Sequence, residues 1–233
     1  MARGRSAVMG MTGALKSAGV ATGDEVIVPA YDTAELARAV VAVGAVPVFA
    51  DIDPSTYCLA PEAVGRAVTS RTAAVVLVRR FGYPADGERF AELAAGHGVL
   101  LIEAEDHEGL GGDMAQRRER AGYLDRRLVG VETPAPAEGH RYQRYVVRVP
   151  GNGRPDRDAF ARLLRRRGVA CEVPVPIPVH RMREFRRDGA SLATTERAAD
   201  ETLALPSLDG LSPAELRRLV SACNALGGLL QPA

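Results

Sequence analysis

The stretch GDEVIVPAYDTAELARAVVAVGAVPVFADIDP, residues 23–54, decides the fold of this chain. It holds two short apolar runs, Glu25–Ala30 and Val46–Ala50, which are typical of strands buried on both faces. Between them, Thr33–Val43 has apolar residues at helical spacing. Because two parallel strands need a crossover of this length, the stretch predicts a strand–helix–strand unit of a parallel sheet.

The same alternation continues towards residue 103. Two further apolar runs, Ala73–Val78 and Val99–Glu103, predict strands, and Pro61–Thr69 and Asp86–His97 predict helices. The first half is therefore expected to be an α/β fold, a parallel sheet flanked by helices.

A Pro/Gly-rich connector, Glu132–Gly139, follows a polar, arginine-rich helix predicted at Met114–Leu128. We expect a large domain at residues 1–113, an interdomain helix at 114–131 and a small C-terminal α+β domain at 132–233. The elements predicted in the last domain are strands at Tyr142–Val149 and Ala170–Val173 and helices at Asp156–Arg167, Thr194–Ala204 and Ser212–Leu226.

The composition is that of a soluble globular protein, with 46% hydrophobic and 25% charged residues in 233. A formal net charge of +1 gives no reason to expect a nucleic acid or a membrane as partner. Cys58, Cys171 and Cys223 are widely spaced, and we interpret them as reduced core thiols of a cytoplasmic protein.

Residues 23–64 resemble the strand–helix–strand block of the DegT/DnrJ/EryC1/StrS family. The similarity continues through RTAAVVLVRRFGYPAD (71–86), HGVLLIEAEDHEG (97–109), QRRERAGYLDRRL (116–128), YVVRVP (145–150), RGVACEVPVPIPVH (167–180) and LALPSLDGLSPAEL (203–216). The resemblance implies a fold-type-I aminotransferase that depends on pyridoxal phosphate (PLP) and acts on nucleotide sugars or antibiotic precursors. It also implies a dimer with active sites at the subunit interface.

The lysine that forms the internal aldimine in this family has no counterpart here. The family carries a long block with that lysine after the strand ending near Glu103, whereas here Gly111–Asp113 leads directly to Met114. The sole lysine of the chain, Lys16, lies on a helix predicted at Ser6–Ala18. The resemblance implies that the start of this helix holds the cofactor phosphate, and Lys16 is roughly 15 Å farther along the helix axis.

Other cofactor contacts implied by the resemblance are also changed. The aspartate that pairs with the pyridinium nitrogen is replaced by Ala104, and the stacking aromatic residue by Thr33. Of the phosphate-binding Ser-Gly-Thr only Ser6 remains in an ungapped alignment, although a gapped alignment matches Gly4–Ala7 to a Gly-Arg variant. We therefore predict a truncated member with no PLP cofactor. A residual PLP-dependent aminotransferase remains an alternative.

An acidic cluster with one histidine follows the last predicted strand of the first domain. Its members are Glu103, Glu105, Asp106, His107 and Glu108. Ligands of open α/β sheets bind at the carboxyl ends of the strands, and crowded carboxylates beside a histidine can form a general acid/base site. The alternative is a solvated loop. Since the spacing fits no standard set of metal ligands, no metal is predicted.

Further residues are candidates for binding a substrate because of their positions. They are Ser6 at the expected helix start, Tyr31, Asp32, Arg79 and Arg80 after strand ends, and His180 after the PVPIPV segment. The arginine pair suits a phosphate or carboxylate.

We expect a repurposed, cofactor-independent enzyme of natural-product or sugar biosynthesis that uses the acidic cluster on a small-molecule intermediate. The alternative is a non-catalytic accessory subunit or regulator that pairs with a full-length aminotransferase. Since the missing block leaves a sheet edge to be covered, we expect a homodimer or a heterodimer with such a relative.

Overall fold

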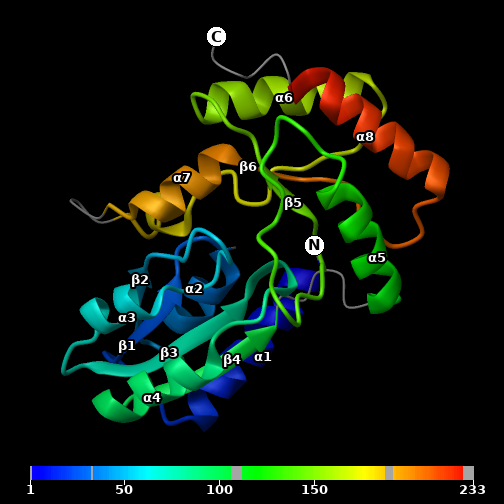
Figure 1. The fold of residues 1–233 in the computed structure, drawn as a ribbon. Coiled ribbons are helices and arrows are strands. Elements are labelled where there is room, and N and C mark those ends of the chain that lie inside the picture. The colour runs from blue at the N-terminus through cyan, green and yellow to red at the C-terminus, as the bar shows by residue number, and fades with distance from the viewer. Residues whose placement is uncertain (1, 33, 106–111, 187–190, 228–233) are drawn as a thin grey trace. The chain divides into compact units, whose positions relative to one another are not determined.

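The computed structural model of the chain describes residues 2–32, 34–105, 112–186 and 191–227. The chain forms two compact units, each built from discontinuous segments (Figure 1). The first unit contains residues 1–79, 85–105 and 177–195, and the second contains residues 80–84, 106–176 and 196–233.

This division differs from the predicted boundaries at residues 113 and 131. Residues 114–131 belong to the second unit, and residues 177–195 return to the first. Long-range hydrogen bonds explain the return. The Val179 amide donates to the Ala30 carbonyl at 3.0 Å, and the Asp51 carboxylate accepts from the Thr195 amide at 2.8 Å.

The first unit has the predicted parallel sheet. Its strands are β1 (Glu25–Pro29), β2 (Val46–Ala50), β3 (Thr72–Arg79) and β4 (Leu100–Glu105), and they are hydrogen-bonded in the order β2-β1-β3-β4. Its helices are α1 (Ala2–Ser17), α2 (Ala34–Ala42), α3 (Pro61–Ala67) and α4 (Gly87–His97).

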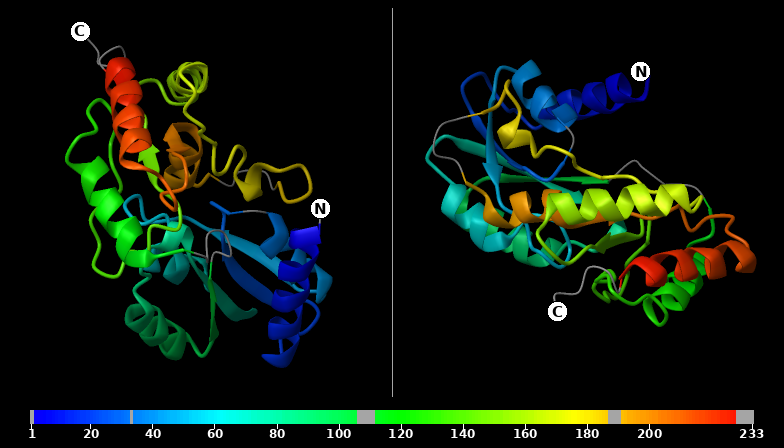
Figure 2. Two further views of the ribbon diagram at one scale, coloured as in Figure 1. Left: turned by 90° about the vertical axis from the view of Figure 1, so that its right-hand side faces the viewer. Right: turned by 90° about the horizontal axis from the view of Figure 1, so that it is seen from above.

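Helices cover both faces of this sheet, as the buried apolar runs predicted (Figure 2). Val26 and Val28 of β1 pack against α1 and α2, whereas Ile27 packs against α3 and α4. Each such side chain contributes about 1.5–3 kcal/mol by leaving water. Asp86 caps α4, because its carboxylate accepts a hydrogen bond from the Arg89 amide at 3.1 Å.

The second unit is the smaller α+β unit. It contains α5 (Met114–Asp125), β5 (Val146–Arg148), α6 (Arg154–Arg166), β6 (Thr202–Ala204) and α8 (Pro213–Gly227), while α7 (Ala193–Glu201) extends from residues of the first unit into this one. β5 and β6 pair antiparallel, and α5, α6 and α8 share one hydrophobic core.

Three predicted elements of this half are wrong in extent. The strand predicted at Tyr142–Val149 shrinks to β5, because Tyr142 has a left-handed backbone with φ of 47°. The strand predicted at Ala170–Val173 is reduced to a bridge between Glu172 and Ala204. The helix predicted at Thr194–Ala204 ends at Glu201, because its last three residues pair with β5.

No helix among residues 2–32, 34–105, 112–186 and 191–227 is long and apolar enough to span a membrane.

Candidate functional site

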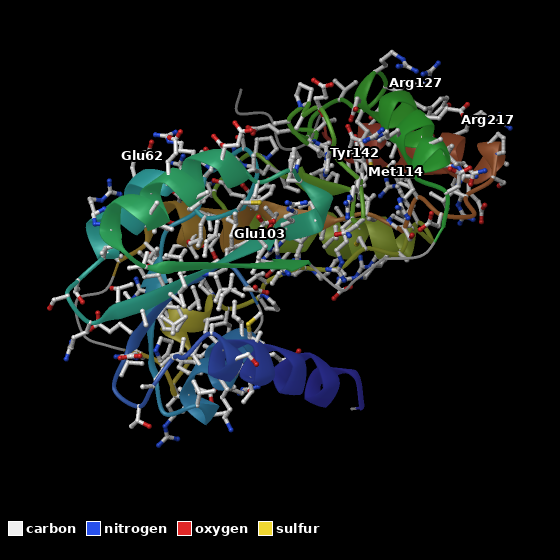
Figure 3. The ribbon with its side chains drawn as sticks, turned by 90° about the horizontal axis from the view of Figure 1, so that it is seen from below. Glu62, Glu103, Met114, Arg127, Tyr142 and Arg217 are labelled. Atoms are coloured by element: carbon white, nitrogen blue, oxygen red, sulfur yellow. The ribbon has the colours of Figure 1, made fainter. Side chains whose placement is uncertain are left out.

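The carboxyl ends of the four parallel strands meet at one edge of the first sheet. At this edge, Arg79 of β3 and Glu103 of β4 form an ion pair, with 2.6 Å between Nη2 and Oε2. Glu103 is labelled on its strand in Figure 3. The pairing follows from the register, in which Leu77 lies opposite Glu103 and Arg79, two residues further along β3, is on the same face of the sheet. The sheet therefore joins two predicted site residues in one partly exposed pair.

The rest of the predicted acidic cluster is not placed. Glu105 is the last residue of β4, and its side chain is outside the described part of the chain. Asp106, His107 and Glu108 also lie outside the described residues. In the described part, no three histidine, cysteine, aspartate or glutamate side chains are grouped so as to hold a metal ion.

Tyr31, Asp32 and His180 come together at the carboxyl end of β1. The Val179 amide donates to the Ala30 carbonyl, and His180 and Tyr31 are the next residues of the two segments. All three side chains are buried, with exposed fractions of 0%, 8% and 2%, and the Tyr31 ring stacks on Tyr57 at 5.6 Å. In this structure they fill the end of the sheet instead of facing solvent.

Arg80 and Ser6 come from other segments of the chain. Arg80 belongs to the segment of the second unit at residues 80–84, is buried, and places its guanidinium carbon 4.7 Å from the centre of the Phe81 ring. α1 begins at Ala2, not at Ser6. The sequence analysis expected an anion site at Ser6 because the helix was predicted to begin there. The observed helix begins four residues earlier, so the Ser6 amide lies inside the helix and not at its start.

Asp51, after β2, was missed by the sequence analysis. Its carboxylate caps α7 and accepts hydrogen bonds from the Thr194 amide at 3.1 Å, the Thr195 amide at 2.8 Å and the Thr195 hydroxyl at 2.7 Å. Burial alone would raise the pKa of Asp51, but these hydrogen bonds lower it below its ordinary value. The only signal in the sequence is an aspartate after a strand, because its partners are 143 and 144 residues away.

PLP needs an acidic partner for its ring nitrogen, and residue 104 does not supply one. Ala104 lies opposite Val78 on the sheet face covered by α1 and α2, and its methyl group packs in the apolar core of that face. Residue 104 is therefore apolar at the position where the family chemistry requires a carboxylate.

The position of Lys16 does not fit PLP either. Lys16 is exposed in the last turn of α1. In the same turn, the Leu15 carbonyl accepts a hydrogen bond from the Val20 amide, and the chain then enters the amino end of β1 at Glu25. The only lysine of the chain thus lies near the amino ends of the strands, whereas the candidate site is at their carboxyl ends. Among the described residues, neither Ala104 nor Lys16 is placed to hold a Schiff-base cofactor.

Comparisons with known proteins identify the family of this chain. Residues 4–108 and 108–224 match the family model of the DegT/DnrJ/EryC1/StrS aminotransferase family. An aminotransferase, TlmJ, from Streptoalloteichus hindustanus has a similar structure, with a TM-score of 0.85, 26% identity, and coverage of 96% of this chain and 84% of that chain.

Curated relatives match over a shorter stretch. L-glutamine:2-deoxy-scyllo-inosose aminotransferase from Streptomyces kanamyceticus is 51% identical over 90 residues, which are 39% of this chain and 21% of that protein. A pleiotropic regulatory protein from Geobacillus stearothermophilus is 44% identical over 90 residues, 39% of this chain and 24% of that protein. The matched stretch thus spans about a fifth to a quarter of these relatives. Since the family model matches nearly the whole chain, this protein belongs to the DegT/DnrJ/EryC1/StrS aminotransferase family.

Proposed function

We propose that this chain does not catalyse PLP-dependent transamination and acts as a non-catalytic subunit that pairs with another chain of its family. The first half of the proposal rests on Ala104 and Lys16. The second half rests on one observation, the open edge of the sheet at β4.

β4 is an edge strand among the described residues, and its side chains are less buried than those of β1. β1, at the centre, is buried along its whole length, whereas Leu100 of β4 is 46% exposed and Leu101 and Ile102 are only partly buried. β4 contains no proline, so its outward amides and carbonyls can pair with a further strand. An edge strand without proline, with exposed or partly buried leucine and isoleucine side chains, can associate with another sheet.

The opposite edge of the sheet is protected. β2 carries Pro47, and the Val46 amide donates to the Asp24 carbonyl on the β1 side, so the alternate residue Pro47 faces outward without an N–H group. The asymmetry between the two edges supports association through β4 and not through β2.

A charge on β4 should abolish this association. We expect the chain to sediment as a dimer at micromolar concentration, either alone or when mixed with a full-length family aminotransferase from the same organism. Leu100→Lys should produce monomers, because a lysine on an edge strand opposes pairing. Val129→Lys is the matched control, since Val129 is 61% exposed but lies in the second unit. A wild-type chain that stays monomeric in both experiments would contradict the proposal.

A repurposed, cofactor-independent enzyme is the second candidate, and the Arg79–Glu103 pair favours it. The pair puts a carboxylate and a guanidinium at the strand ends, where ligands of such sheets bind. Alanine at both Glu105 and His107 distinguishes the two functions. It should abolish acid/base catalysis on an intermediate, whereas a non-catalytic subunit should retain its partner.

A further inference from the structure

A groove of about 550 Å³ opens in the first unit, beside the outer edge of β2. It is lined by α2, by β2 and by residues 184–186. Its volume is in the range of small-molecule sites.

The floor and walls of the groove are apolar. Phe49 of β2 and Phe185 meet edge to face, with ring centres 5.8 Å apart and planes at 73°. Val41 is 52% exposed at the end of α2, and Val46 and Pro47 continue the apolar surface. Exposed side chains of this size gathered around two aromatic rings bind an apolar body.

Among the described residues that line the groove, the charged groups have a net positive charge. Glu184 is neutralised by Arg38, with 2.6 Å between Nη2 of Arg38 and Oε1 of Glu184. Arg186 is exposed and remains as a second guanidinium, and Arg181 and Arg183 are exposed on the same segment. One guanidinium in excess of the carboxylate favours an anionic group on the ligand.

An extended peptide is a poor fit to this groove. Strand addition needs outward N–H groups from β2, and Pro47 has none. The lining therefore favours a compact ligand.

We propose that this groove binds a small amphiphilic anion, an apolar ring or short chain that carries one carboxylate, sulfonate or phosphate. The apolar body lies against Phe49 and Phe185, and the anionic group pairs with Arg186. This site is distinct from the strand ends and from the β4 edge, so it is independent of the proposed function.

Two fluorescent probes of similar size test the proposal. These are 8-anilino-1-naphthalenesulfonate, which is an anion, and N-phenyl-1-naphthylamine, which lacks the charge. Val41→Glu should abolish binding of both probes to the groove, because it puts a carboxylate beside the apolar wall. Arg186→Gln should weaken the anionic probe at least fivefold and leave the neutral probe unchanged.

Matched substitutions outside the groove serve as controls. Val129→Glu and Arg217→Gln change exposed residues of the second unit and should leave both affinities unchanged, and far-ultraviolet circular dichroism should confirm that every variant is folded. If a folded Val41→Glu protein binds the anionic probe as the wild type does, the groove is not the site. Equal effects of Arg186→Gln on the two probes would show that the pocket does not select an anion.

Discussion

Replacement of Arg157 by alanine is expected to lower the free energy of unfolding by about 3 to 5 kcal/mol. Arg157 lies in α6 and is the largest fully buried side chain among the described residues, with 1% exposed. Its Nη1 donates to the Ala199 carbonyl at 3.0 Å and to the Thr202 carbonyl at 2.8 Å, and its Nε donates to Asp158 at 2.7 Å. Truncation leaves buried acceptors without donors and opens a cavity between α6 and the α7–β6 junction.

Urea unfolding followed by circular dichroism measures this loss. Arg162→Ala is the matched control, because Arg162 is exposed on the same helix and should change the free energy of unfolding by less than about 0.5 kcal/mol. Equal effects of the two substitutions would mean that the buried guanidinium does not hold α6 to the α7–β6 junction.

Acidification from pH 6.5 to pH 4 is expected to destabilise the fold by up to about 3 kcal/mol through His140 alone. The ring of His140 is stacked between Tyr83 at 3.8 Å and Tyr142 at 3.9 Å and is almost completely buried. Burial and, to a smaller extent, the Arg118 cation lower the pKa of His140 to about 4, and the nearby Phe81 backbone only partly opposes this shift.

The direction of the effect follows from which state binds the proton. Below pH 6.5, His140 binds a proton in the unfolded chain but stays neutral in the folded one. The free energy of unfolding therefore decreases as the pH is lowered, until the folded residue also protonates near pH 4. Above pH 6.5 both states are neutral and the contribution is constant. His140→Phe keeps an aromatic ring between the two tyrosines and should remove this part of the pH dependence. If the variant and the wild type lose stability in parallel between pH 6.5 and pH 4, His140 is not the group responsible.

The strands of the first unit could be predicted to within one or two residues, because each contains an apolar run that lies between two layers of helices. β1 was predicted at Glu25–Ala30 and is observed at Glu25–Pro29, and β2 agrees at both ends. The Ser212–Glu215 capping box was also predictable, because both residues lie in one turn and hydrogen-bond to each other.

Features that depend on distant partners could not be predicted in this way. β6 is three residues that continue a helical pattern, and it becomes a strand only because β5 lies beside it. Residues 177–195 join the first unit through hydrogen bonds to Ala30 and Asp51, which no local pattern indicates.

For the candidate site, too, the positions of residues along the strands could be predicted, whereas their contacts with distant segments could not. The strand-end positions of Arg79 and Glu103 follow from local sequence. Their ion pair depends on the register between β3 and β4, and the burial of His180 depends on a contact with a segment about 150 residues away.

Reduction with borohydride is the most direct test of whether this polypeptide can capture an aldehyde as family enzymes do. The folded chain is mixed with one equivalent of pyridoxal phosphate, reduced, and analysed by intact-mass spectrometry and peptide mapping. With Lys16 exposed at the wrong edge of the sheet and Ala104 in place of an acid, the expected spectrum is that of the unmodified protein. A stoichiometric pyridoxyl adduct on Lys16 that is lost in Lys16→Ala would contradict the account and make the chain an amino-group transferase.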